Sequence, residues 1–338
     1  MIKRIVYLGY YLKTLNKKKL QLFLAYTSKI THKSKAALLM DVLMSVFKYN
    51  ISILEYFQFR FFEKNNEERA QWAGTGYMFE FQLKMNPKHA RAILDDKTKF
   101  YKSYSKYFVH SVGDIADLKS KLELVNKLLD NPSGKLVFKV ADGKCGVQVA
   151  ILPTADFNQN TLVLFMEKQK YDLVEEFILQ HPQLNALSPS AVNTVRIFTQ
   201  LDVNNQVVIL GCRQRISVNS PVDNMAAGNM AAPIDEATGI VNGPGVYSDI
   251  LKADQTKHPI TGVAVVGFQV PFWKEIIEMV KEAAITHPEN RSIGWDVVVT
   301  ENGPGFIEGN HDWCKLLWQL PAKKGLKSLL EPHNINHV

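Results

Sequence analysis

Apolar residues recur at helical spacing in the first part of the chain and give way to short Val- and Ile-rich runs in the second. Residues 1 to about 85 are predicted to be helical, because LQLFLAYTSKI, AALLMDVLMSVF and ILEYFQFRFF form apolar stripes. Helical patterns continue from about 87 to 130, until Pro132 and Gly134 interrupt them.

Strands are predicted beyond this point at KLVFKV (135–140), GVQVAIL (146–152), TVRIFTQL (194–201), QVVILGCRQRI (206–216) and a hairpin over 295–310. A helix, FWKEIIEMVKEAAI (272–285), precedes the hairpin. Strand pairs with short turns and interspersed helices predict an α+β protein with antiparallel sheets. The sequence has neither G-x-G-x-x-G after a strand nor G-x-x-x-x-G-K-[ST], so two common nucleotide-binding folds lack their signatures.

The positive charge of the chain is concentrated at its N-terminal end. The 338 residues carry a net charge of +7, yet residues 1–64 hold twelve Lys/Arg against Asp41, Glu55 and Glu63, a net +9. This charge fits either a solvated helical face or contact with an anionic membrane or glycan, whereas no nucleic-acid motif accompanies it. Three unpaired cysteines and the lack of a spanning or signal segment predict a cytoplasmic protein.

Three oxygen-bearing side chains lie within the predicted hairpin. If residues 301–305 form a five-residue turn, Thr300 faces Phe306 and Asp296 faces Asn310. Alternation then puts Asp296, Glu308 and Asn310 on one face, although a four-residue turn would separate Asp296 from the others. Two carboxylates and an amide oxygen suit Mg²⁺, and a polar face salt-bridged to neighbours is the alternative.

A second candidate site follows the strand that ends at Lys139. The loop after it contains Gly143 and Gly146, and glycines allow backbone N–H groups to approach a phosphate. An ordinary hairpin turn is the alternative.

Five segments in sequence order resemble the ATP-grasp superfamily. They are ILDDKTKF, VEEFILQHPQLNALSPSAVNTVRIFT, VDNMAAGN with IDEATG, HPITG, and IGWDVVVTENGPGFIEGN. The chain is most similar to the sugar-transfer-associated branch, which is related to α-L-glutamate ligases and found with exopolysaccharide and capsule synthesis genes. The resemblance implies an ATP-grasp fold over 86–325, divided at 180/181, with nucleotide between two antiparallel subdomains. A basic helical region (1–85) precedes it and a tail (326–338) follows it.

The resemblance also implies roles for individual residues. Lys97 and Lys139 would contact ATP, the loop 141–146 would close over the phosphates, and the metal would be Mg²⁺, as two ions, or Mn²⁺. The metal ligands would be Asp296, Glu308 and Asn310, and the hinge beside adenine would contain Glu175, Glu176, Phe177 and Ile178, with His181 near the ribose. The chain departs from the family in having Val140 after Lys139 and Gly294 where many relatives have an arginine.

The missing arginine has three candidate replacements, Arg196, Arg213 and Arg215, on neighbouring predicted strands. A guanidinium binds a carboxylate or phosphoryl group bidentately, although charges on an exposed strand face are the alternative. Asn193, Asp223 and Asn224 are candidates for orienting the acceptor.

The expected activity is ATP-dependent ligation of a carboxylate and an amine through an acylphosphate, in surface polysaccharide synthesis. The alternative is a kinase that phosphorylates a sugar or glycan hydroxyl. The sequence leaves the substrates and the oligomeric state open.

Overall fold

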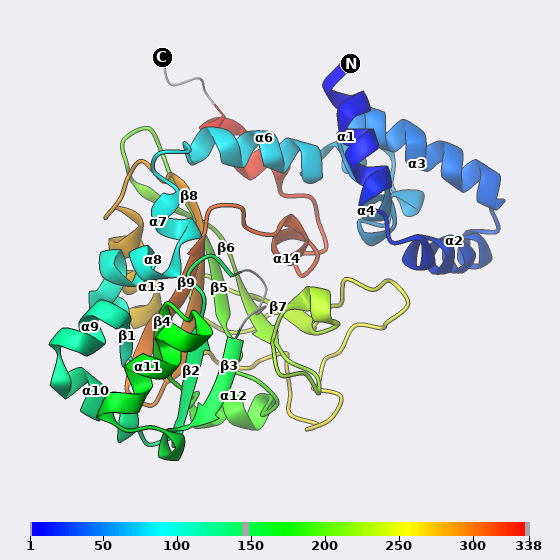
Figure 1. The fold of residues 1–338 in the computed structure, drawn as a ribbon. Coiled ribbons are helices and arrows are strands. Elements are labelled where there is room, and N and C mark those ends of the chain that lie inside the picture. The colour runs from blue at the N-terminus through cyan, green and yellow to red at the C-terminus, as the bar shows by residue number, and fades with distance from the viewer. Residues whose placement is uncertain (1, 144–148, 335–338) are drawn as a thin grey trace.

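Two antiparallel sheets organise the computed structural model, which describes residues 2–143 and 149–334 (Figure 1). The smaller has the strand order β1-β4-β2-β3 and the larger the order β7-β6-β5-β8-β9. The α+β prediction with antiparallel sheets is therefore confirmed. The strands are β1 (Val112–Asp114), β2 (Lys135–Lys139), β3 (Val149–Pro153), β4 (Leu173–Glu176), β5 (Val195–Leu201), β6 (Val207–Ile216), β7 (Met230–Ile234), β8 (Ser292–Thr300) and β9 (Gly303–Asn310).

Helices fill the N-terminal quarter of the chain, as predicted. Polar caps separate them: the Asn16 and Ser34 side chains accept hydrogen bonds from the Lys19 and Ala37 amides at the starts of α2 and α3. The α-helices are α1 (Ile2–Lys13), α2 (Lys17–Thr31), α3 (Lys35–Tyr49), α4 (Ile53–Gln58), α5 (Asn66–Ala70), α6 (Thr75–Met85), α7 (Ala92–Asp95), α8 (Lys97–Tyr104), α9 (Ile115–Ser120), α10 (Leu122–Leu129), α11 (Gln159–Gln169), α12 (Pro182–Leu187), α13 (Trp273–Ala284) and α14 (Lys315–Gln319).

The large sheet lies between packed layers, so its central strands are buried throughout. Every residue of β5 and of β8 is buried. On one face Trp295 stacks on Phe306 with ring centres 4.8 Å apart, and Ile276 and Val280 of α13 join the same apolar core. The opposite face carries the polar residues described below. Helix α13 therefore packs on the face of the sheet that does not carry them.

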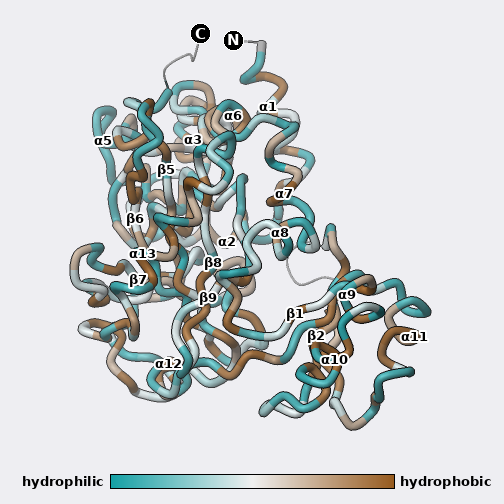
Figure 2. The backbone as a smooth tube through the Cα atoms, turned by 90° about the vertical axis from the view of Figure 1, so that its left-hand side faces the viewer, coloured by the Kyte–Doolittle hydropathy of each residue, from teal (hydrophilic) through white to brown (hydrophobic). Residues whose placement is uncertain are grey.

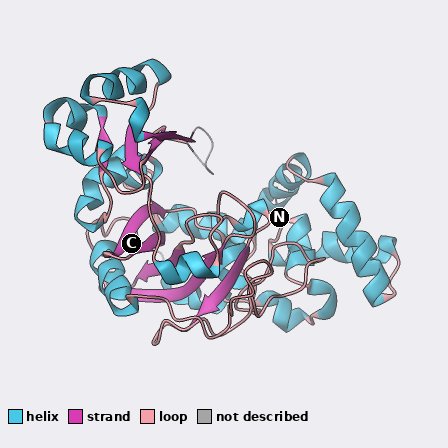
Figure 3. Ribbon diagram, turned by 90° about the horizontal axis from the view of Figure 1, so that it is seen from below, coloured by secondary structure: helices cyan, strands magenta, loops and turns pink. Residues whose placement is uncertain are grey.

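The small sheet forms a lobe of its own. Helices α9, α10 and α11 pack on it around Phe138, Leu162 and Val174, all fully buried. Figure 2 shows this lobe standing apart from the body of the molecule, and Figure 3 shows the large sheet between it and the N-terminal helices. The large sheet therefore lies between the small-sheet lobe and the N-terminal helices.

The N-terminal helices share their core with the last part of the chain. Phe23, Tyr56 and Phe57 belong to one apolar cluster with Trp318 and Leu330. The Gln319 side chain adds a two-way bridge, because its Oε1 accepts from the Ala73 amide at 2.9 Å and its Nε2 donates to the Ala73 carbonyl at 3.0 Å. Boundaries at 85/86, 180/181 and 325/326 stay predictions, and this core draws on both ends of the chain.

A buried ion pair fixes α4 to α14. Lys315 Nζ lies 3.0 Å from Glu55 Oε1, and the Glu55 side chain is 2% exposed. Burial alone would raise the pKa of Glu55, but the Lys315 charge and hydrogen bonds from Ser52 and Thr75 lower it below 4.5. This carboxylate therefore stabilises the fold when it is ionised.

We expect Glu55→Gln to destabilise the protein by about 3–5 kcal/mol at pH 7, because it leaves the Lys315 ammonium without its partner. The pKa of Glu55 is lower in the folded than in the unfolded state, so its contribution is present above the unfolded pKa. It is lost as the pH falls through the folded pKa. Denaturant unfolding at pH 7 and at about pH 3 should therefore give a smaller difference between wild type and variant at the lower pH. Exposed Glu67 provides the control, since Glu67→Gln should change the midpoint little, and an equally large effect there would contradict the assignment.

Candidate active site

The hairpin of β8 and β9 has a tighter turn than the sequence analysis expects. Thr300 pairs with Gly303, so the turn consists of residues 301 and 302 and not of 301–305. Asp296 accordingly pairs with Glu308 and not with Asn310, and Val298 pairs with Gly305 and not with Glu308. The predicted register is therefore wrong. Gly303, directly after the turn, has a φ of 111°, a backbone conformation that favours glycine.

A β-bulge nevertheless brings the three polar side chains together. The register shifts between Asp296 and Val297, which leaves one extra residue, Ile307, in β9. This single residue restores the parity that the short turn removes. Asp296 and Glu308 are therefore cross-strand neighbours, and Asn310 follows two residues later on the same face as Glu308.

Two arginines hold the Asp296 carboxylate. Arg196 donates from Nε to Oδ1 at 2.6 Å and from its terminal nitrogen to Oδ2 at 2.7 Å, while Arg215 donates to Oδ2 at 3.0 Å. The side chains are 7%, 11% and 4% exposed for Arg196, Arg215 and Asp296. Although burial raises the pKa of Asp296, the two guanidinium groups lower it to about 2. The salt-bridged face that the sequence left as an alternative is thus present at this residue.

Arg215 bridges two acids through its terminal nitrogens. Its other terminal nitrogen lies 2.5 Å from Asp223 Oδ1, and Asp223 Oδ2 accepts hydrogen bonds from Thr194 N and Oγ1 at 2.8 and 2.7 Å. Its Nε makes no hydrogen bond within residues 2–143 and 149–334. Asp223 therefore orients Arg215.

Arg196 stands where close packing at Gly294 leaves no room for another arginine. A Cβ at Gly294 would lie 2.6 Å from the Trp313 Cβ and 3.4 Å from the Arg196 Cδ. Any side chain there would displace Trp313, which is 2% exposed and lies against Phe198. The guanidinium beside Asp296 comes from β5 instead of from β8.

Glu308 differs from Asp296 in having no guanidinium partner in the described part of the chain. Its Oε1 accepts a hydrogen bond from Asn310 Nδ2 at 3.2 Å. Burial, followed by the nearby charge of Asp296, raises the pKa of Glu308. A divalent cation would remove this conflict, and the Glu308 carboxylate and Asn310 amide oxygen fit Mg²⁺. Over residues 2–143 and 149–334 no cluster of three His, Cys, Asp or Glu side chains is arranged to hold a metal.

The glycine loop lies beside these residues at the start of α8. The Lys97 ammonium donates to the Gly143 carbonyl, and the Lys97 amide donates to the Ala141 carbonyl at 3.0 Å. Burial lowers the pKa of Lys97, while Glu308 partly opposes this effect. Gly146, the other predicted glycine of this loop, lies outside the described residues.

Lys139 forms a buried ion pair on the small sheet. Its Nζ lies 2.5 Å from Glu175 Oε2, and His110, which the sequence analysis missed, places Nε2 3.5 Å from the same oxygen. Burial raises the pKa of Glu175, but Lys139 and then His110 bring it down to about 2. Lys139 and Glu175, two of the predicted site residues, therefore form an ion pair with each other.

The remaining predicted residues serve local contacts. Arg213 turns away from Asp296 and donates from Nε to the Trp318 carbonyl at 3.0 Å. The fully buried Asn193 binds loop atoms, including the Ser217 amide at 2.7 Å. His181 caps α12, and Asn224 caps a 3-10 turn beside the pocket. Glu176 and Phe177 donate backbone hydrogen bonds to Ser111 and Lys135, next to Ile178.

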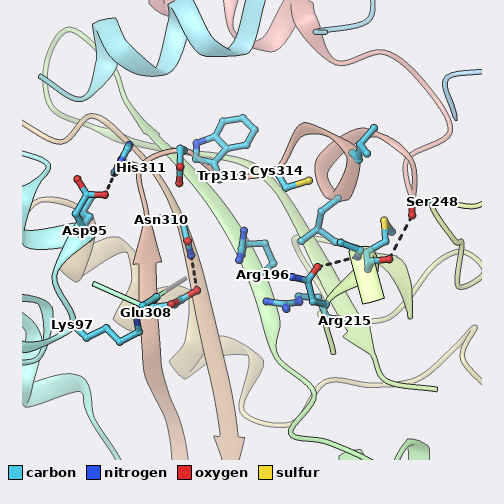
Figure 4. Close-up of a pocket in the computed structure, with 18 of the residues that line it drawn as sticks. Asp95, Lys97, Arg196, Arg215, Ser248, Glu308, Asn310, His311, Trp313 and Cys314 are labelled. Carbon is cyan, nitrogen blue, oxygen red and sulfur yellow. Dashed lines mark hydrogen bonds and ion pairs between the residues drawn. The ribbon is translucent and has the colours of Figure 1, made fainter. Parts of the chain in front are cut away.

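A cavity of about 460 Å³ brings together seven of the predicted residues but is not lined by Asp296 or Lys139; the seven are Lys97, Gly143, Arg196, Arg215, Asn224, Glu308 and Asn310. Figure 4 shows Lys97, Glu308 and Asn310 at one end, Arg196 and Arg215 in the middle, and Cys314 and Ser248 beyond them. Several residues that line the cavity are not among the predicted site residues, because no local sequence pattern marks them: Lys19, Gln58, Asp95, Ser248, His311 and Cys314. The cavity is large enough for a small-molecule substrate.

The chain is similar to several solved structures at low sequence identity. The chain is similar to the solved ATP-grasp ligase PsnB complexed with minimal precursor, with 11% identity and a TM-score of 0.43 over 73% of this chain and 61% of that one. It is similar to D-cycloserine synthetase DcsG, with 10% identity and a TM-score of 0.43 over 74% and 72%. For D-alanyl-alanine synthetase A from Vibrio cholerae O1 biovar eltor str. N16961 the values are 11% and 0.39 over 72% and 65%.

The assignment of the chain to a family rests on a match to a family sequence model. The chain spans less than two thirds of the PsnB structure, and a comparison with curated proteins finds no match. The model of sugar-transfer associated ATP-grasp proteins matches residues 78–335, well over half of the chain. The chain therefore belongs to the sugar-transfer associated ATP-grasp family.

Proposed function

We propose that the protein is an ATP- and Mg²⁺-dependent carboxylate–amine ligase. In this proposal a substrate carboxylate attacks the γ-phosphorus of ATP, which releases ADP and gives an acylphosphate. An amine then displaces phosphate, loses a proton and forms the amide. A sugar acid joined to an amino acid or amino sugar, for a surface polysaccharide, is the proposed substrate pair, and a sugar or glycan kinase is the alternative.

One observation carries the proposal: a single cavity is lined by Arg196, Arg215 and Lys97 together with Glu308, whose carboxylate has no guanidinium partner among the described residues. Phosphoryl transfer depends mainly on positioning and charge stabilisation, so it needs no protein nucleophile. Arg215 suits the transferred group because it lines the cavity, and Asp223 and Asp296 hold its guanidinium group in place. Lys97, at the same end as Glu308, would bind a phosphate oxygen.

Glu308 and Asn310 would hold the magnesium ion, which would supply charge neutralisation between phosphates. Asp296 remains a proposed ligand, although both of its oxygens receive hydrogen bonds from arginines. Lys139, Glu175 and the segment 176–178 are proposed to border the nucleotide from the small sheet.

The direct test is ADP release from ATP and Mg²⁺ with sugar acids and amino acids supplied in pairs. A ligase requires both substrates and yields an amide and phosphate. A stable phosphorylated product without an amine would instead support the kinase. ATP hydrolysis that no carboxylate or hydroxyl compound stimulates would contradict both.

A second candidate function is peripheral binding to an anionic membrane. None of the described helices is long and apolar enough to cross a bilayer. The outward side of α3, however, carries five large exposed apolar residues spaced along one side of the helix: Leu39, Met40, Leu43, Met44 and Phe47. Together with the +9 charge of residues 1–64, this apolar face favours a bilayer over a polyanionic glycan, which offers no apolar interior.

We expect Leu43→Glu with Phe47→Glu to reduce binding to phosphatidylserine-containing vesicles by about 10-fold or more, because two charges would enter the apolar contact. Wild-type binding should fall as salt is added. Co-sedimentation measures both effects, with phosphatidylcholine vesicles as the neutral reference. Leu164→Glu on α11, where the side chain is 63% exposed, is the matched control. Equal binding of all three proteins would exclude α3 as the contact.

A further inference from the structure

The wall of the cavity opposite the small-sheet lobe contains residues from the N-terminal helices. Lys19 of α2 and Gln58 of α4 line the cavity, together with Ser248 and Cys314. Both helices lie before residue 78, where the match to the family model begins. The part of the chain that the family model does not match therefore completes the candidate active site.

Several contacts fix this wall in place. Gln58 Nε2 donates to the Ser248 carbonyl at 3.0 Å, which joins α4 to the loop after β7. The Glu55–Lys315 ion pair holds the same helix to α14, directly after Cys314. The Lys19 amide donates to Asn16 Oδ1 at 2.9 Å in the first turn of α2. Lys19 thus projects from a capped helix start and not from a loose segment.

The chemistry of this end of the cavity is that of a cation beside apolar side chains. Lys19 is half-buried, its Nζ lies 5.4 Å from the centre of the Phe23 ring, and it forms no ion pair within residues 2–143 and 149–334. Met225, Leu316 and Leu317 supply apolar lining. A lysine ammonium in such a position binds a carboxylate or phosphate as a point charge.

We infer that the N-terminal helices form the acceptor-binding wall of the cavity, and that Lys19 binds an anionic group of the substrate other than the one that reacts. This inference rests on the proposed ligase function, because it identifies the class of compound that this function would use. Arg196 and Arg215 lie between this wall and Glu308, so they would face the reacting carboxylate. The substrate would therefore carry the reacting carboxylate and a second, separate anionic group on a body with an apolar face.

Cys314 offers a readout that does not depend on turnover. It is exposed and lines the cavity, whereas Cys212 is buried. With Cys145 replaced by serine, the rate of alkylation by the neutral reagent iodoacetamide reports access to this wall. The measurement is made with ADP and Mg²⁺ present, while glucuronate, glucose 1-phosphate or glucose is added.

We expect the two anionic sugars to slow alkylation of Cys314 and glucose to leave it unchanged. Whichever anion protects at the lower concentration assigns the site to a carboxylate or to a phosphate. Lys19→Gln should raise the concentration needed for half protection by at least about 10-fold, because a charge-assisted contact is lost. Lys18→Gln, an exposed neighbour that does not line the cavity, is the matched control and should behave as wild type.

Equal half-protection concentrations for Lys19→Gln and the parent protein would overturn the inference, as would a lack of protection by either anion. The proposed ligase function has its own readout in the same proteins, which is the thermal stabilisation by ATP with Mg²⁺. If ATP with Mg²⁺ does not stabilise the parent protein, the proposed ligase function is contradicted, while the result for anion binding at Lys19 remains valid. Retained stabilisation in Lys19→Gln with weakened anion protection would support both.

Discussion

Replacing Glu308 by glutamine is expected to lower ADP release by at least about 100-fold, because a metal ligand should matter no less than the outer-shell groups around it. The substitution keeps the size of the side chain and its hydrogen bond with Asn310, and it removes a half-buried charge that Asp296 repels. The fold should therefore remain as stable as wild type or become slightly more stable. Steady-state ADP release and thermal unfolding measure the two effects.

Glu301 supplies the matched control for this experiment. It lies in the turn of the same hairpin and is exposed, so Glu301→Gln makes the same chemical change outside the cavity. Activity near the wild-type value is expected for this control. Near-normal turnover of Glu308→Gln would remove Glu308 from the proposed metal site.

Replacing Asp296 by asparagine should have a different result, namely a loss of stability of about 3–5 kcal/mol together with the loss of activity. From the sequence, Asp296 is expected to be a metal ligand, with a salt-bridged polar face as the alternative. In the structure its carboxylate balances two guanidinium groups whose side chains are 7% and 11% exposed. The neutral amide would leave Arg196 and Arg215 buried with less compensation, which is costly.

The shift in the denaturant midpoint measures this effect. Asp156→Asn, at an exposed position in the small-sheet lobe, should change the midpoint little. Adding Arg196→Met to Asp296→Asn should recover part of the stability, because it removes one of the unbalanced charges. A midpoint shift for Asp296→Asn as small as that of Asp156→Asn would show that the arginine pairs contribute little to stability.

Local periodicity predicts the parts of the fold that have long repeating patterns. The three N-terminal apolar segments and the runs that became β2, β5, β6 and α13 each span several repeats, so the prediction needs no knowledge of tertiary contacts. Strands β1, β4 and β7 have three to five residues and no alternation that distinguishes them from loops. Glu175 and Glu176, which the resemblance assigns to the hinge, are the last two residues of strand β4 in the small sheet.

The candidate site shows which information the sequence lacks. A bulge at a single residue, Ile307, decides whether Asp296 and Glu308 share a face. No residue type in this segment predicts the bulge. Alternation places Arg213 and Arg215 on one face, but only the position of the Trp318 carbonyl directs Arg213 elsewhere. Lys19 reaches the cavity through tertiary packing more than 170 residues away in sequence from the arginines. Gly294 is informative about the arginines. Many relatives have an arginine at this position, so its absence here indicates that the guanidinium group comes from another strand.

The bridge between Gln319 and Ala73 also has a consequence for the order in which the chain folds. The core of the N-terminal helices includes Trp318 and Leu330, so these helices lack part of their packing until residues 318–330 have been synthesised. Contacts of such long sequence separation close a large loop and form slowly. During synthesis the part of the helices' apolar surface that packs against Trp318 and Leu330 would stay uncovered, which favours aggregation at this stage.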